Sequence, residues 1–85
     1  MTLRIVNSPV ARLGVAAGYE IAEKRAKALG CSRVHLLNIE RGAATASQAL
    51  IGRMAGLYGV KRSKVELAIK QARKLLMKRT LNSLG

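Results

Sequence analysis

Arginines such as Arg33 and carboxamides such as that of Asn38 are the side chains of this sequence that could bind the edges of bases. A guanidinium can donate two hydrogen bonds to the edge of a guanine, and a carboxamide can pair in the same bidentate way with an adenine. Sixteen lysines and arginines stand against four acidic residues, so the net charge is +12 and the partner should be negatively charged. A nucleic acid fits both features.

The side chains needed for catalysis or metal binding are scarce. The acidic residues are Glu20, Glu23, Glu40 and Glu66, and they predict neither a carboxylate pair across a cleft nor a Ser-His-Asp arrangement. His35 has no Cys, Asp or second His at metal-ligand spacing. We therefore expect a protein that is not an enzyme and that uses no metal, cofactor or small-molecule substrate.

Charge and cysteine content bear on where the chain works. A net charge of +12 exceeds the magnitude of roughly 2 to 8 that is usual for a small soluble domain, so solubility alone explains it poorly. The single cysteine, Cys31, excludes an intramolecular disulfide. The N-terminus lacks a signal-peptide pattern, and no stretch approaches the roughly 20 apolar residues that span a bilayer. We expect a cytoplasmic protein that does not insert into a membrane.

The composition predicts an all-α fold, a compact bundle of about five helices in a single domain spanning residues 1–85. Apolar residues make up 49% of the chain and aromatic residues only 2%, which favours closely packed helices over a sheet. Within an N-terminal arm at 1–8, residues 2–6 could form a short strand. The core of the domain should lie at 9–60.

Capping residues and glycines set the expected helix boundaries. Three of the predicted helices are preceded by serines suited to cap them, Ser8, Ser32 and Ser47, and are followed by glycines that can take a positive φ. A capping box at residues 63–66 predicts the start of a longer C-terminal helix. The predicted helices are 9–17, 21–29, 33–41 and 48–58, followed by the C-terminal helix within 61–80.

Residues 22–41 place small and apolar side chains at the positions that a helix-turn-helix requires. Ala26 must be small because the second helix crosses close to it, and Gly30 must permit the sharp turn. Leu29, Leu36 and Ile39 must be apolar to fix the angle between the two helices. The angle between the two helices determines the direction in which the exposed face of the second helix points.

The sequence ALGCSRVHLLNIERG, followed by SQALIGRMAGLYGV, resembles the Cro and phage-repressor (Xre-type) family. The resemblance covers roughly residues 9–60, and it implies a bundle of about five helices in which 32–41 is the recognition helix. It also departs from the family pattern, because Ala22, Arg25 and Ala46 stand where Gln, Leu and Pro are frequent. By position in the family, Glu40 should be a structural ion-pair member, here with Arg12.

The resemblance implies that one face of the recognition helix meets DNA in the major groove. Its base-reading residues should be Arg33, Val34, Leu37 and Asn38, with the apolar pair against thymine methyl groups. Leu37 could equally be a core residue, and Asn38 could simply be solvated. Cationic and hydroxyl side chains that suit phosphate oxygens are Ser32, Arg41, Lys24, Lys27, Arg53, Lys61 and Arg62.

Two functions from different classes follow. The first is a transcriptional regulator, a repressor that binds a palindromic operator in double-stranded DNA as a homodimer, with two recognition helices about one helical turn apart. The fifth helix is slightly favoured over residues 2–6 as the dimer contact. The second is a sequence-indifferent nucleoid or architectural protein, for which the basic C-terminal helix would suffice.

Overall fold

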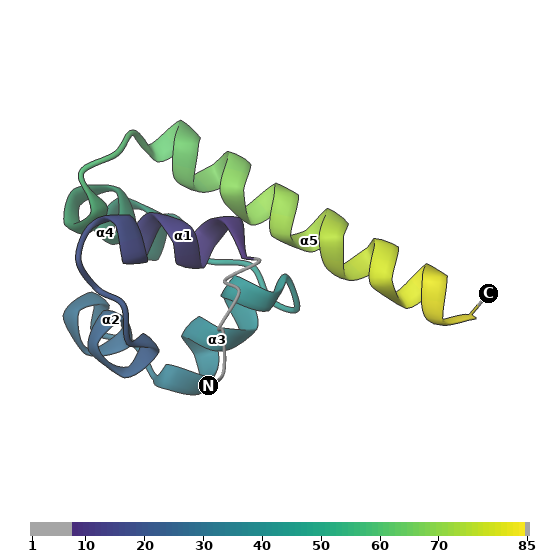
Figure 1. Cartoon of the computed structure of the whole chain (residues 1–85). Coiled ribbons are helices and arrows are strands. Elements are labelled where there is room, and N and C mark those ends of the chain that lie inside the picture. Colours follow the sequence, from purple (N-terminus) through teal and green to yellow (C-terminus); the bar gives the residue numbers. More distant parts are fainter. Residues whose placement is uncertain (1–7, 85) are drawn as a thin grey trace.

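The computed structural model describes residues 8–84, with side chains described for 8–78. In this range the chain forms helices, turns and loops and no strand, which confirms the predicted all-α bundle of five helices (Figure 1). The predicted strand or arm at 2–6 lies outside the described residues. The helices are α1 (Pro9–Ala16), α2 (Ala22–Leu29), α3 (Arg33–Arg41), α4 (Gln48–Tyr58) and α5 (Arg62–Leu84).

The three predicted serine caps are confirmed. The Ser8, Ser32 and Ser47 hydroxyl oxygens accept hydrogen bonds from backbone N–H groups three residues later, at 3.2, 3.1 and 3.1 Å. These bonds satisfy donors that would otherwise have no partner in the first turns of α1, α3 and α4. Local sequence therefore fixes where these helices begin.

The start of α5 lies two residues before the position that the capping box predicts. The helix begins at Arg62, so Ser63 lies inside its first turn and does not cap it. The first helical hydrogen bonds are accepted by the carbonyl oxygen of Lys61, from the N–H groups of Lys64 at 3.0 Å and Val65 at 3.3 Å. Lys61 therefore occupies the capping position that the capping box assigned to Ser63.

A single aliphatic core lies between the helices. The largest fully buried side chains come from all five helices, and Tyr58 is the only aromatic ring buried among residues 8–78. Close approach of the helices follows from the abundance of alanine and glycine at their contacts. The fully buried large side chains are Val10, Leu29, Leu36, Ile39, Met54 and Val65.

Helix α5 packs on α1, α4 and the C-terminal end of α3, and its second half continues beyond them (Figure 1). Gly42, which follows α3 with φ +88°, lies directly against the backbone of α5. A Cβ added there would collide with the carbonyl oxygen of Ala72 and lie 2.9 Å from the Cα of Arg73. Glycine is thus needed at this crossing both for its positive φ and for its lack of a side chain.

Candidate nucleic-acid interface

The α2 and α3 helices form a helix-turn-helix whose turn is closed by backbone hydrogen bonds. Gly30 takes φ 73°, ψ 30° after the last turn of α2, and the N–H of Cys31 donates to the carbonyl oxygen of Ala26 at 3.1 Å. Ser32 then caps α3 within two residues of Gly30. The predicted turn position of Gly30 is confirmed.

Buried side chains fix the relation between the two helices. Ala26 and Leu29 of α2 and Leu36 and Ile39 of α3 are all at most 3% exposed, as the sequence predicted. Because these residues pack as one cluster, rotation of α3 relative to α2 would open a cavity in the core. The outer face of α3 is therefore held in a defined direction.

The candidate base-reading residues share that outer face. At about 100° per residue, Arg33, Val34, Leu37, Asn38 and Arg41 fall within an arc of about 140° on α3. Arg33 and Arg41 are exposed and Val34 is 69% exposed, whereas Leu37 and Asn38 are half-buried. The surface combines bidentate donors with an exposed apolar side chain, which is the chemistry that the major-groove edges of base pairs can meet.

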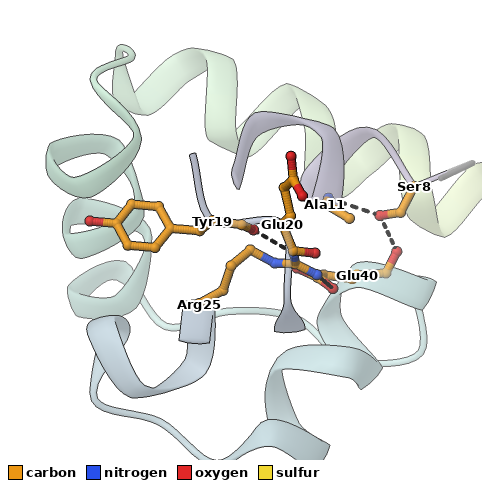
Figure 2. Close-up of polar contacts among 6 residues, drawn as sticks. All are labelled: Ser8, Ala11, Tyr19, Glu20, Arg25 and Glu40. Atoms are coloured by element: carbon orange, nitrogen blue, oxygen red, sulfur yellow. Dashed lines mark hydrogen bonds and ion pairs between the residues drawn. The ribbon is translucent and has the colours of Figure 1, made fainter. Parts of the chain in front are cut away.

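A buried ion pair ties α3 to α2. The Nε and Nη2 atoms of Arg25 donate to the two carboxylate oxygens of Glu40 at 2.8 and 2.9 Å, and both side chains are 5% exposed (Figure 2). The Nη1 atom of Arg25 donates to the carbonyl oxygens of Tyr19 at 2.7 Å and Glu20 at 3.0 Å. One guanidinium thus joins α2, α3 and the segment between α1 and α2.

The pairing of Glu40 corrects one prediction. Glu40 has the structural role that the sequence suggested, but the guanidinium that meets both of its carboxylate oxygens belongs to Arg25, where we had expected Arg12. Arg25 replaces an apolar residue on the inner face of α2, beside Ala26 and Leu29, and a cation at such a position needs a buried anion. That position could have indicated that Arg25 is buried beside an anion, but it does not identify Glu40 as that anion.

The N-terminal end of α1 is also fastened to α3. Besides capping α1, the Ser8 hydroxyl donates to the backbone carbonyl oxygen of Glu40 at 2.5 Å (Figure 2). Glu40 is therefore held through its side chain by α2 and through its backbone by the residue that precedes α1. The C-terminal half of α3 is immobilised from two directions.

Tyr58 of α4 lies next to this ion pair, and sequence reasoning did not single out its hydroxyl. Tyr58 is 6% exposed and its hydroxyl oxygen has no hydrogen-bond partner in the described part of the chain. Burial, followed by the nearby Glu40 carboxylate, raises the pKa of Tyr58 to about 12. A Cβ on Gly14 would lie 3.1 Å from the hydroxyl oxygen and would overlap Arg25. The Tyr58 ring and the Cδ atom of Arg25 together leave no room for a side chain at position 14.

Cys31 and His35 show no arrangement for metal binding. Burial first, and the Glu40 carboxylate second, raise the pKa of the Cys31 thiol above its usual value, which disfavours the thiolate that metals bind. Among residues 8–84 no group of three or more His, Cys, Asp or Glu side chains could hold a metal ion. No helix of this range is long and apolar enough to cross a membrane.

The structure brings only some of the candidate phosphate contacts together. Lys24 and Lys27 are exposed on α2, and Ser32 and Arg41 mark the two ends of α3. Arg53 of α4 is exposed beside the turn, and its Nη1 atom donates to the carbonyl oxygen of Leu29 at 3.3 Å. These five exposed side chains come from α2, from the two ends of α3 and from the part of α4 beside the turn.

Lys61 and Arg62 lie elsewhere. Lys61 lies in the connection between α4 and α5, and Arg62 is the first residue of α5. Figure 1 shows this part of the chain at the top of the bundle, whereas α2 and α3 lie at the bottom. Arg62 also has a partner within the chain, because its Nη2 atom donates to the carbonyl oxygen and Oε1 atom of Gln48 at 3.0 and 2.8 Å. These two residues are not part of the surface around α3.

No protein-family model, no curated protein and no solved structure matches this chain. The α3 surface is nevertheless well defined chemically. Its cations can neutralise phosphates, and its exposed valine and polar side chains can meet base edges. Neither a nucleophile with a base nor a carboxylate pair accompanies them on α3, whose only acidic residue, Glu40, is engaged by Arg25.

Proposed function

We propose that the protein binds double-stranded DNA sequence-specifically, with α3 as a recognition helix in the major groove. The observation that carries this proposal is the outer face of α3, on which Arg33, Val34, Asn38 and Arg41 project from a helix locked by the buried Arg25–Glu40 pair. Base readout needs hydrogen-bonding groups at defined positions, and a helix fixed to its neighbours supplies them.

The electrostatics support the same partner. A net charge of +12 on 85 residues gives a strong attraction to a polyanion, and α2, α3 and α4 all carry exposed cations. Phosphate contacts from these side chains would set the register of α3 in the groove. We therefore place the protein in the cytoplasm, on the nucleoid, as a binding protein and not an enzyme.

The length of α3 favours a dimer. Its nine residues span about 13 Å, which covers about four base-pair steps, and so short a site recurs too often in a genome to direct regulation. Two copies on a palindrome, with half-sites one helical turn apart, double the sequence that is read. The function proposed is thus that of a dimeric transcriptional regulator, a repressor of the Cro or Xre type.

A sequence-indifferent nucleoid protein is the competing function. It is favoured by the exposed cations that do not belong to α3, such as Lys61 and those of α5, because these can contribute only to backbone binding. The two functions differ in how binding responds to excess random DNA. A sequence reader retains its site under such competition, whereas an architectural protein is displaced.

Selection of binders from a pool of random duplexes tests the proposal. We expect one enriched palindromic site, and a loss of about 1 to 3 kcal/mol of discrimination at a single base pair for Arg33→Ala and again for Asn38→Ala. Lys61→Ala and Gln71→Ala are matched controls, since they remove an exposed cation and an exposed carboxamide that do not belong to α3. A preference that survives both α3 substitutions would show that α3 does not read bases.

A further inference from the structure

The second half of α5 leaves the bundle. Beyond Ala72, which is buried against Gly42, no side chain from Arg73 to Lys78 is buried. Figure 1 shows this part of the helix continuing past the other four helices toward the C-terminus. We call residues 73–84 the projecting segment. Because none of these side chains is fully buried, this part of the helix gains less stability from tertiary packing than the first half, and its surface is accessible to another molecule.

The exposed surface around this segment is strongly basic. Lys70, Arg73, Lys74 and Lys78 are all exposed, and no acidic residue follows Glu66 in the sequence. Lys70, Lys74 and Lys78 succeed one another at four-residue spacing, where like charges repel along a helix. Binding of an anion would relieve this repulsion. The charge pattern therefore points to an anionic partner of some length.

The basic segment begins where the proposed recognition helix ends. Gly42, directly after α3, lies against Ala72 and the Cα of Arg73, and Arg41 before it is exposed. Cations thus continue from the C-terminal end of α3 onto α5 without an intervening acidic side chain. A DNA backbone that Arg41 contacts would next meet the projecting segment.

We propose that the projecting segment binds the phosphate backbone of the same DNA duplex, outside the base pairs that α3 reads. This inference rests on the proposed function, and it adds a second contact surface to it. From residue 73 to residue 84 the helix is about 17 Å long, which matches about five base-pair steps. The segment extends each protomer's contact with DNA beyond its half-site.

The exposed apolar residues of α5 do not favour a membrane or a second helix as the occupant. Leu67, Leu75 and Met77 are 55%, 41% and 66% exposed. At about 100° per residue they spread over about 160° of the helix surface, with Lys74 and Lys78 between them. A helix that lies on a bilayer or packs in a coiled coil needs one continuous apolar stripe. The outer face of α5 lacks that stripe.

The test uses two double substitutions that remove the same charge. K74Q/K78Q alters the projecting segment, and K61Q/K64Q alters two exposed lysines around the start of α5. Binding of each full-length variant is measured against salt concentration on two duplexes that carry the selected site. One duplex ends at the site, and the other continues for about 15 base pairs on each side.

On the long duplex we expect K74Q/K78Q to make the slope of log K against log salt shallower by about 2 per bound protomer, because two phosphate contacts are lost. On the trimmed duplex the two variants should behave alike. K61Q/K64Q should change the slope by less than half as much on either duplex. Sedimentation of each variant shows whether the oligomeric state has stayed constant.

Three results would overturn the inference. Equal slopes for the two variants on the long duplex would show that the segment makes no flanking contact. In a second assay, one duplex is attached to beads and the protein is tested for capture of a second, free duplex. If wild type captures it and K74Q/K78Q does not, the segment bridges two duplexes. A change of mass in K74Q/K78Q would assign it to self-association. If wild type shows no sequence preference, the proposed function is refuted. In that case, a difference in salt slope between the two variants on long random duplexes would still support DNA binding by the projecting segment.

Discussion

Arg25 and Glu40 meet as a bidentate ion pair inside the bundle, with both guanidinium donors within 2.9 Å of a carboxylate oxygen. The pair connects the inner faces of α2 and α3 at a place where α2 otherwise presents Ala26 and Leu29. A buried pair of this kind adds little stability compared with apolar packing, but loss of one partner leaves an isolated charge in the core. Its geometry therefore specifies how α3 sits on α2.

The first prediction concerns the loss of one partner. Arg25→Met keeps much of the side-chain volume but leaves Glu40 buried without its cation, so we expect the free energy of unfolding to fall by about 3 to 5 kcal/mol. Urea denaturation measures this change. Arg33→Met, at an exposed arginine of α3, serves as the control and should stay within about 0.5 kcal/mol of wild type.

The double variant R25M/E40M gives a second readout if Arg25→Met does not fold. Replacing both charges with apolar side chains removes the desolvation penalty, so the double variant should be several kcal/mol more stable than Arg25→Met alone. The double variant should bind DNA more weakly than wild type, because it lacks the hydrogen bonds that orient α3. A double variant no more stable than the single one would contradict the ion-pair explanation.

The second prediction concerns the pH dependence that follows from Tyr58. The folded state raises the pKa of its hydroxyl to about 12, so between the ordinary value of about 10 and 12 the folded protein keeps a proton that the unfolded chain has lost. Stability from this group is therefore fully present below about pH 10 and falls by about 2 to 3 kcal/mol as the pH rises to about 12.

Tyr58→Phe isolates this effect. Other groups that titrate at high pH contribute equally to both proteins. Above about pH 10, the unfolding free energy of wild type should therefore fall relative to that of the variant. Below that pH the variant should be at least as stable as wild type, because the buried hydroxyl has no partner in the described residues. A constant difference from pH 8 to 12 would contradict the raised pKa.

The third prediction concerns Val34 and thymine methyl groups. Val34 is 69% exposed on α3, so Val34→Ala should leave stability within about 0.5 kcal/mol of wild type. If its methyl groups touch a thymine, replacing that thymine with deoxyuridine weakens wild-type binding and leaves Val34→Ala unaffected. Leu67→Ala, at an exposed leucine of α5, should respond to deoxyuridine as wild type does. Equal responses of Val34→Ala and wild type would remove Val34 from the base contacts.

Local signals in the sequence located most of the fold. Serine caps and left-handed glycines act within a few residues, so the boundaries of α3 and α4 and the turn at Gly30 could be predicted from them. The capping box at residues 63–66 failed because the carbonyl oxygen of Lys61, two residues before Ser63, accepts the first helical hydrogen bonds. Local patterns predict that a helix starts, and competing acceptors decide where.

Contacts between distant residues could not be predicted in the same way. The choice of Arg25 over Arg12 as the partner of Glu40 depends on how α2 crosses α3, which no local pattern encodes. The separation of Lys61 and Arg62 from the α3 surface depends on the direction in which α4 leaves the turn. The sequence identified the residues of the α3 face because one helix carries them all.

The last prediction concerns the crossing of Gly42 with α5. Gly42→Ala forces an alanine to φ +88° and places its Cβ against the Ala72 backbone, which cannot move aside as a side chain could. We expect stability to fall by more than about 1 kcal/mol, and the projecting segment to shift relative to α3. Gly56→Ala is the matched control, because that helical glycine faces open space and alanine there should stabilise by about 0.5 to 1 kcal/mol. Urea denaturation of both variants separates the two effects, and a Gly42→Ala protein as stable as wild type would show that α5 is not held at this crossing.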